Sequence, residues 1–477
     1  MSPRKPLRTA LARLSVLDGT ILGKWELGKR GLVKRGLGRL LLAPLLLGAL
    51  LSGALPNLAA AQDFAIINAK VAIGDGSEPI ENGVVIVRGG KIAAAGPAGS
   101  GHDAKTADSF GVDTLYNARG AWVTPGIFAA LTDLGLVDVG GVEESNDTSA
   151  QGSQFNAALD VARAINPAAQ DIAVSRAGGV TRASTAPLAA NSIFAGQGAI
   201  IDLGADRAAV VQPRAFQLVV LGEGGARLAG GSRMASKAAL RNALREAAAF
   251  AKGAWKGDAS LLTRADAAAL GPVIQGKQKL YIHAERAADI LSILAMGKEF
   301  PRLDMVLVSA SEGWLVADEI AAARVPVIAD ALDDLPSSFE QLAATQSNIG
   351  RMVDAGVTVA IGGMSGIEQP RNSAQYAGNL VALNKVPRAS GLSWGEALAA
   401  ITSVPAAISG FAGKLGALTP GAAGDVVIWD GDPLELSSAP LQIFIDGVKQ
   451  PLSNHQTRLR DRYQDLDESE LPKAYDW

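Results

Sequence analysis

The sequence of 477 residues contains no cysteine, which excludes disulfides, thiolate nucleophiles and cysteine-based metal sites. Histidine is nearly as scarce, because the chain holds only His102, His283 and His455. Charged residues make up 19% and aromatic residues 5%, whereas hydrophobic residues reach 48% and glycines number 54. This composition excludes a disordered chain and favours an α/β fold over an all-β one. The length predicts a large domain together with a smaller one.

The N-terminal end of the chain carries a net positive charge, unlike the rest. Residues 1–39 carry ten Lys or Arg and two acidic residues, whereas the whole chain has a net charge of −3. The rest of the chain is therefore acidic and has no basic cluster. We expect no nucleic-acid partner, because such proteins carry concentrated positive charge.

Residues 1–61 have the order of a secretory signal. Basic residues precede an apolar run at 40–55, and Ala59 and Ala61 form an A-x-A cleavage site. An uncleaved anchor is the alternative, but the run is shorter than the roughly 20 residues of a spanning helix and Pro44 interrupts it. We predict cleavage after Ala61, export to the periplasm or beyond, and no stable membrane span in the mature protein.

Short β-type segments occur near both ends of the remaining chain. Each end also carries a two-residue hairpin signal, Gly89-Gly90 and Asp446-Gly447. We expect residues 62–122 and 414–451 to form one small composite β-sandwich. A polar tail at 452–477 is expected to hold a short helix.

Between these ends, residues 123–413 alternate between strand-like and helix-like segments. Such alternation predicts βα units and a parallel sheet, and the spacing matches a distorted (β/α)8 TIM-type barrel. The predicted strands are 178–182, 199–203, 216–221, 279–283, 305–309, 326–329 and 357–361. The predicted helices are 234–255, 285–298, 312–323, 338–354 and 372–385.

Two ordered motifs frame this barrel. The first is Trp122-Val123-Thr124-Pro125-Gly126, which leads into the first barrel strand. The second runs from Gly416 to Trp429, GALTPGAAGDVVIW, and returns to the small β domain. Over residues 64–450 the chain resembles the amidohydrolase superfamily, in the branch of imidazolonepropionase-related proteins. Gly424 stands where the second motif usually has alanine.

The resemblance implies hydrolysis of carbon–nitrogen bonds in amides, ureides or cyclic imides by one or two divalent metals, commonly zinc. It also implies ligands at the carboxyl ends of the barrel strands. Here Leu131 and Asp133 occupy the His-x-His positions, Met364 stands at the strand-eight aspartate, and Glu223 is the sole strand-four candidate. Only His283 keeps the residue type of the superfamily, so we predict no metal site of ordinary strength and leave the cofactor open.

Each candidate site residue has a structural alternative. His283 suits a general base or a substrate contact, yet a lone histidine is equally well a hydrogen-bonded relic. Glu285 and Arg286 suit an acid and an anion clamp, or else simple helix-start chemistry. Asp133 is a catalytic candidate or a loop cap. The predicted site comprises His283, Glu285 and Asp133 as catalytic residues, with Arg286, Ser311 and Met364 binding the substrate.

Two functions follow from this site. The first is an exported hydrolase of non-peptide carbon–nitrogen bonds with a reduced or atypical metal site, acting on a small molecule. The second is an inactive relative that binds a ligand or supports a partner subunit. Assembly with itself or with a related barrel protein is left open by the sequence.

Overall fold

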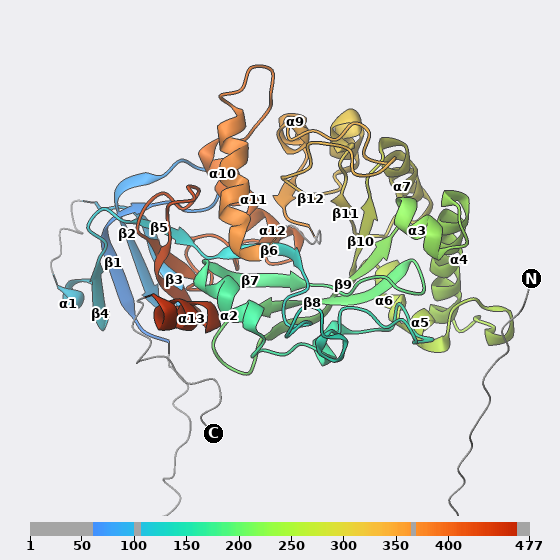
Figure 1. Cartoon of the computed structure of the whole chain (residues 1–477), viewed down its shortest axis with the longest axis horizontal. Coiled ribbons are helices and arrows are strands. Elements are labelled where there is room, and N and C mark those ends of the chain that lie inside the picture. The colour runs from blue at the N-terminus through green and yellow to red at the C-terminus, as the bar shows by residue number, and fades with distance from the viewer. Residues whose placement is uncertain (1–60, 100–105, 364–368, 465–477) are drawn as a thin grey trace, which may run out of the picture. The chain divides into compact units, whose positions relative to one another are not determined.

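The computed structural model describes residues 61–99, 106–363 and 369–464. Met364 and nearly all of the predicted signal segment lie outside the described residues. Two eight-stranded sheets organise the described chain, and their strands come from different parts of the sequence. Figure 1 shows them side by side, with the segments from the two chain ends together in one sheet.

The first sheet is a nearly closed barrel whose strands follow one another in chain order. Alternate residues face inward because a strand turns its side chains to opposite faces. Phe128, Phe216 and Tyr281 fill the interior, and the last two rings stack with centroids 4.1 Å apart. The barrel strands are β6 (Ile127–Thr132), β7 (Val180–Thr185), β8 (Phe194–Asp202), β9 (Val210–Val220), β10 (Lys279–Ala284), β11 (Met305–Ser309), β12 (Val327–Ala329) and β13 (Val359–Ile361).

The predicted distorted α/β barrel is confirmed, but one strand departs from the expected parallel sheet. β8 runs antiparallel to both β7 and β9, whereas the other paired neighbours in this sheet are parallel. The physical reason is the length of the connections at 186–193 and 203–209. A crossover between parallel strands needs about a dozen residues or more, so these short links make hairpins instead.

Helices cover the outside of the barrel, mostly after β9 (Figure 1). The long predicted helix is present as α4, which buries Leu240, Ala243, Leu244 and Ala247 in the main hydrophobic core. The helices of this region are α2 (Gln170–Ala177), α3 (Gly222–Leu228), α4 (Arg233–Ala251), α5 (Arg264–Ala269), α6 (Gly271–Ile274), α7 (Ala287–Glu299), α8 (Ala317–Ala323), α9 (Asn348–Asp354), α10 (Ser373–Leu383), α11 (Trp394–Ala400) and α12 (Ser403–Ile408).

The predicted helix at 338–354 is mostly wrong. Only its last part forms α9, and residues 338–347 remain an irregular segment. Side chains of this segment make hydrogen bonds to distant residues instead of lying along a helix face. Glu340, for example, accepts a bond from the main-chain nitrogen of Glu223 at 2.7 Å. Local sequence pattern does not register such long-range contacts.

The second sheet is built from both ends of the chain, as expected. Its neighbours run in the order β16-β15-β14-β5-β1-β2-β3, and β4 pairs with β1. Phe64 from the first strand stacks on Phe444 near the last, with centroids 4.2 Å apart. The strands are β1 (Phe64–Val71), β2 (Ile80–Arg88), β3 (Lys91–Pro97), β4 (Thr114–Asn117), β5 (Trp122–Pro125), β14 (Val426–Trp429), β15 (Pro440–Ile445) and β16 (Val448–Lys449), with the short helices α1 (Ala107–Phe110) and α13 (His455–Tyr463).

A buried ion pair joins this second sheet to the barrel. Arg182 on β7 donates to both carboxylate oxygens of Asp425, at 2.7 and 2.9 Å, and both side chains are nearly inaccessible. Two parallel hydrogen bonds of this kind hold a guanidinium and a carboxylate in one geometry. The barrel is thereby fixed to the strand that follows the GALTPGAAGD motif.

Candidate functional site

A cavity of about 620 Å³ opens where the carboxyl ends of β9 to β13 converge. This is the end of the barrel at which chemistry occurs in barrel enzymes. Its walls combine leucines and valines with acidic groups. The polar lining residues include His283, Glu285, Asp330, Asp333, Asp334 and Gln341, and the apolar ones include Leu131, Leu188, Leu218 and Val308.

His283 reaches the cavity because of the alternation along β10. Tyr281 and His283 share the inward face of the strand, whereas Ile282 packs outward among the core residues beneath the helices. The imidazole is 31% exposed. Its Nε2 lies 3.3 Å from Oε1 of Glu285, and its Nδ1 is buried with no hydrogen-bond partner among the described residues.

Glu285 is held from the other side by Ser311. Its Oε2 accepts a hydrogen bond from the Ser311 main-chain nitrogen at 3.0 Å and contacts the Ser311 hydroxyl at 2.7 Å. Glu285 and Ser311 are only 6% and 1% exposed. The carboxylate is therefore fixed between an imidazole on the cavity wall and a serine behind it.

A left-handed kink after β11 brings Ser311 to this position. Ser309 and Ala310 both have positive φ, 70° and 52°, a conformation that costs ordinary residues free energy. Asn348 donates to the Ala310 carbonyl at 3.0 Å, and the Ala310 nitrogen donates to the Ala284 carbonyl at 3.0 Å. These bonds stabilise the kink that turns Ser311 toward Glu285.

The segment 330–347, between β12 and α9, closes the site. Asp333 Oδ2 lies within hydrogen-bond distance of the Ser311 hydroxyl, and the Gln341 amide nitrogen donates to that hydroxyl at 3.1 Å. Ser337 and Ser338 donate to the amide oxygen of Gln341, which directs its nitrogen toward Ser311. Four groups, His283, Glu285, Ser311 and Asp333, thus form one connected row.

The environment shifts the pKa values along this row in opposite directions. Burial opposes charge on His283, but its hydrogen bond to Glu285 and the charge of that carboxylate raise the pKa of His283 overall. Burial likewise opposes charge on Glu285, yet His283 and Ser311 lower its pKa. Burial, together with the charges of Asp330 and Glu285, raises the pKa of Asp333 despite its bond to Ser311. Carboxyls whose pKa values are pushed apart are suited to different roles.

The residues at the strand ends do not fit the metal centre that the resemblance implies. Leu131, Val308 and Gly363 line the cavity where β6, β11 and β13 end. None of these supplies a donor, and the one imidazole faces a carboxylate. Across residues 61–99, 106–363 and 369–464, no group of three or more His, Cys, Asp or Glu is placed to hold a metal ion. Zinc sites use at least three converging protein ligands.

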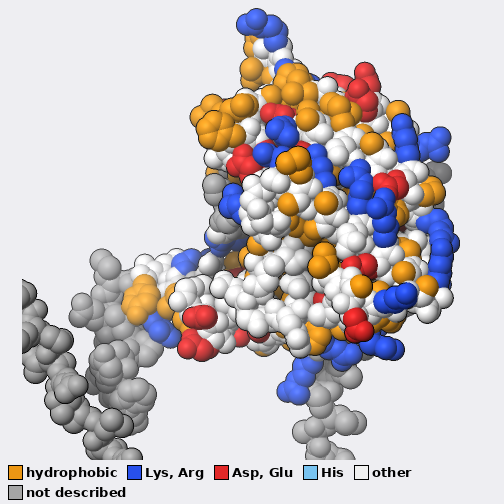
Figure 2. Space-filling view, turned by 90° about the vertical axis from the view of Figure 1, so that its right-hand side faces the viewer, with side chains coloured by type: hydrophobic (Ala, Val, Ile, Leu, Met, Phe, Trp, Pro, Cys, Tyr) orange, Lys and Arg blue, Asp and Glu red, His pale blue; other side chains and the backbone are white. Residues whose placement is uncertain are grey.

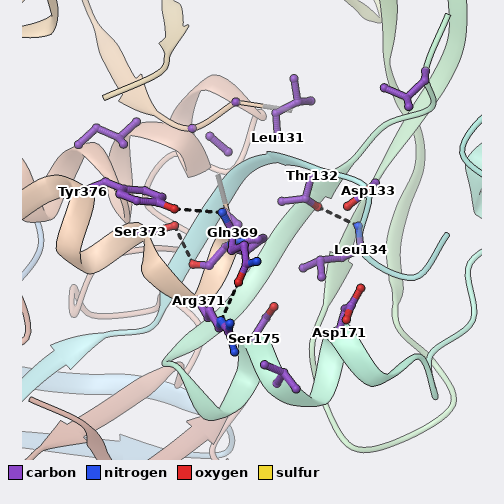
Figure 3. A pocket seen from close by; sticks show the side chains of 18 of the residues that line it. Leu131, Thr132, Asp133, Leu134, Asp171, Ser175, Gln369, Arg371, Ser373 and Tyr376 are labelled. Atoms are coloured by element: carbon purple, nitrogen blue, oxygen red, sulfur yellow. Dashed lines mark hydrogen bonds between the residues drawn. The ribbon is translucent and has the colours of Figure 1, made fainter. Parts of the chain in front are cut away.

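Asp133 lies in a second cavity of about 500 Å³, which shares Leu131, Leu188 and Gly363 with the first. Figure 3 shows Asp133 and Asp171 near each other in this cavity, with Arg371 on another part of its wall. Burial and then the charge of Asp133 raise the pKa of Asp171. The structure therefore separates Asp133 from the row that contains His283.

Two further predicted residues, Arg286 and Glu223, have other surroundings. Arg286 lies 3.3 Å from the buried carboxylate of Asp289 and does not line either cavity. Glu223, in the first turn of α3, lies 3.4 Å from Arg233. Met364 falls outside the described residues. Ser311 is part of the row, although it lies behind the cavity wall rather than on it.

Sequence reasoning missed Asp333 and Gln341. Both lie in the segment 330–347, which pattern alone assigned largely to a helix. One available signal was the acidic run Asp330, Asp333, Asp334 directly after a predicted barrel strand, since residues there face the barrel mouth.

The outer surface gives no sign of a single basic patch on the face seen in Figure 2. Lys and Arg side chains there alternate with acidic and apolar ones. In the part of the chain that the structure describes, no helix has both the length and the apolar character needed to span a bilayer.

Comparisons with known proteins agree with this architecture. Residues 234–443 match the family model described as Amidohydrolase family. The chain is 24% identical over 370 residues to the amidohydrolase tasK of Hapsidospora irregularis, covering 70% of this chain and 37% of that protein. The chain therefore spans little more than a third of this curated relative. In fold it is similar to an amidohydrolase of Thermotoga maritima MSB8, with a TM-score of 0.69, 22% identity, and coverage of 81% and 99% of the two chains.

Proposed function

We propose that this chain, which belongs to the amidohydrolase superfamily, hydrolyses carbon–nitrogen bonds of a small molecule at its barrel mouth without a conventional metal centre. The superfamily predicted from the sequence is confirmed, whereas the imidazolonepropionase-related branch stays a prediction. The observation that carries the proposal is the row of His283, Glu285, Ser311 and Asp333 beside the cavity at the barrel mouth.

Hydrolysis of an amide needs a group that accepts a proton from water and a group that gives one to the leaving nitrogen. His283 and Glu285 lie together on the cavity wall, and this pair is the candidate acceptor. Asp333, whose pKa is raised by burial and neighbouring carboxylates, is the candidate donor. The apolar walls formed by Leu131, Leu188, Leu218 and Val308 suit an uncharged or partly apolar substrate.

A turnover screen on the mature chain tests this proposal. Purified protein, treated with chelator, is incubated with N-acyl amino acids, dipeptides, ureides and lactams, and product formation is followed by mass spectrometry. We expect turnover that falls at least tenfold in Asp333→Asn, since acid–base groups contribute about 10²–10⁴-fold to rates. Asp334→Asn is the matched control, because this exposed carboxyl lines the same cavity outside the row. Equal rates in both variants would contradict the assignment of Asp333.

A second candidate is a ligand-binding protein without turnover. One observation favours it: Nε2 of His283 faces Glu285 while Nδ1 is buried and unpartnered, which leaves neither nitrogen plainly directed at the cavity. The same screen separates the two. Ligands that raise the thermal unfolding midpoint, but that remain intact in the presence of the protein, would support binding and count against hydrolysis.

Export remains part of the proposal. Support comes from the order of charged, apolar and small residues before Gln62. Gln62, the first residue expected after cleavage, is joined to the second sheet, because its nitrogen donates to the Gly447 carbonyl at 3.1 Å. N-terminal sequencing of protein recovered from the periplasm should give Gln62 as the first residue; recovery of an uncleaved chain in the membrane would overturn export by cleavage.

A further inference from the structure

The Ser311 hydroxyl has more polar neighbours than its own hydrogen can serve. A hydroxyl carries one hydrogen to donate and two lone pairs to accept. Ser311 Oγ contacts Oε2 of Glu285, Oδ2 of Asp333 and Nε2 of Gln341. Gln341 Nε2 only donates, because Ser337 and Ser338 donate to the oxygen of the same amide. One hydroxyl hydrogen is therefore left between two carboxyl groups.

A single hydrogen cannot satisfy both contacts if both carboxyls are ionised. Two bare carboxylates facing the same oxygen would place like charge together in a largely buried space, which strongly raises one pKa. The contact is satisfied when one carboxyl carries a proton and donates to Ser311 while Ser311 donates to the other. The geometry therefore requires that one of the two carboxyl groups is protonated.

The surroundings decide which carboxyl carries that proton. Glu285 already receives the Ser311 main-chain nitrogen at 3.0 Å and faces His283 at 3.3 Å. Donors such as these stabilise an ionised carboxylate. From the described residues, Asp333 receives only the Ser311 hydroxyl and a longer contact of 3.4 Å from Gln341. Glu285 is therefore the acceptor and Asp333 the acid.

We propose that Ser311 bridges Glu285 and Asp333 through one shared proton, which rests on Asp333 at neutral pH and makes this residue a neutral acid on the cavity wall. The charged groups around Asp333 favour its neutral form. Asp330 and Asp334 lie on its own segment, Glu285 and His283 on the end of β10, and no Lys or Arg is among the described residues that line the cavity. Burial and the charge of Asp330 also raise its pKa.

This inference deepens the proposed function, because such an acid is the proton source that a leaving nitrogen requires. The proton itself does not depend on turnover, and it is measurable on the mature chain without any substrate. A protein that holds this proton but hydrolyses nothing would therefore refute the proposed function alone.

Infrared difference spectroscopy tests the proposal. At pH 7 the wild type should show the carbonyl stretch of one protonated carboxylic acid that Asp333→Asn removes and the exposed control Asp334→Asn keeps. Glu285→Gln should keep the band but shift its loss to lower pH, because the charge of Glu285 no longer raises the pKa of Asp333. Circular dichroism checks that each variant is folded.

Three results would overturn the proposal: no such band in the wild type at pH 7, a band that survives Asp333→Asn, or a band in Glu285→Gln that is lost at the same pH as in the wild type. Titration of the wild type needs no variant and guards against misfolding. The band should disappear only well above the ordinary aspartate pKa of about 3.9. Loss of the band near that ordinary value would likewise rule the shared proton out.

Discussion

Glu285 lines the cavity and also affects the stability of the fold, because its carboxylate interacts with His283 and Ser311. Its lowered pKa means that its contribution to folding is present above the usual glutamate pKa and is lost as pH falls through the folded value. The raised pKa of His283 acts in the opposite direction. Its contribution to folding stability is present below about pH 6.5 and is lost as the pH rises through the pKa of His283 in the folded protein. The charged pair therefore stabilises the protein most in mildly acidic solution.

Replacing Glu285 with Gln should destabilise the protein by about 1–3 kcal/mol, the typical cost of losing a hydrogen bond to a charged group. The deficit should be largest between about pH 5 and 6 and should shrink on either side of that range. Urea unfolding of wild type and variant from pH 4 to 9 measures it. Glu144→Gln, at an exposed position, is the matched control and should give a flat difference. A deficit independent of pH would show that the pair is not charged as described.

At this scale the sequence could predict the residues that its strands carry. His283 and Glu285 follow a recognisable strand, and alternation alone turns His283 inward. Asp333 and Gln341 reach Ser311 from a segment without regular structure, and the hydroxyl geometry that makes them important exists only after folding. No local pattern encodes such a contact.

Among the elements, the C-terminal half of the barrel was easier to predict than its first half. Strands β10 to β13 are separated by helices, so their parallel order follows from the alternation. β8 breaks that order because hairpins replace helices on both sides of it. The prediction relied on strand-like composition in this region and gave too little weight to connection length, which was visible in the sequence.

The ion pair between β7 and the residue before β14 should dominate the attachment of the second sheet. Asp425→Asn leaves the buried Arg182 guanidinium without its carboxylate, and breaking such a pair costs about 3–5 kcal/mol. Asp446 lies 2.8 Å from the same guanidinium but is 57% exposed, so Asp446→Asn should cost no more than about 1 kcal/mol. Urea unfolding at pH 7 compares the two. Equal losses would mean that solvent screens both carboxylates alike.

For the whole molecule, the architecture resembles that of the amidohydrolases, whereas the cavity lacks the ligands that the resemblance implies. The two sheets resemble in fold those of an amidohydrolase of Thermotoga maritima MSB8, and residues 234–443 match the amidohydrolase family model. The barrel mouth instead offers one imidazole, several carboxyls and apolar strand ends. Fold does not determine function, so the site must be tested on its own terms.

The mature chain should therefore neither need nor gain stability from a divalent metal. A zinc ion present at a hundred times its Kd would stabilise the folded state by about 2.7 kcal/mol. Because Leu131, Val308 and Gly363 provide no ligands, we expect the thermal unfolding midpoint to be the same after chelation and after addition of zinc. Elemental analysis of the purified protein should find less than one metal per chain. A stoichiometric metal, together with a midpoint that falls on chelation, would show that donors outside the described row complete a metal centre and would refute metal-free hydrolysis.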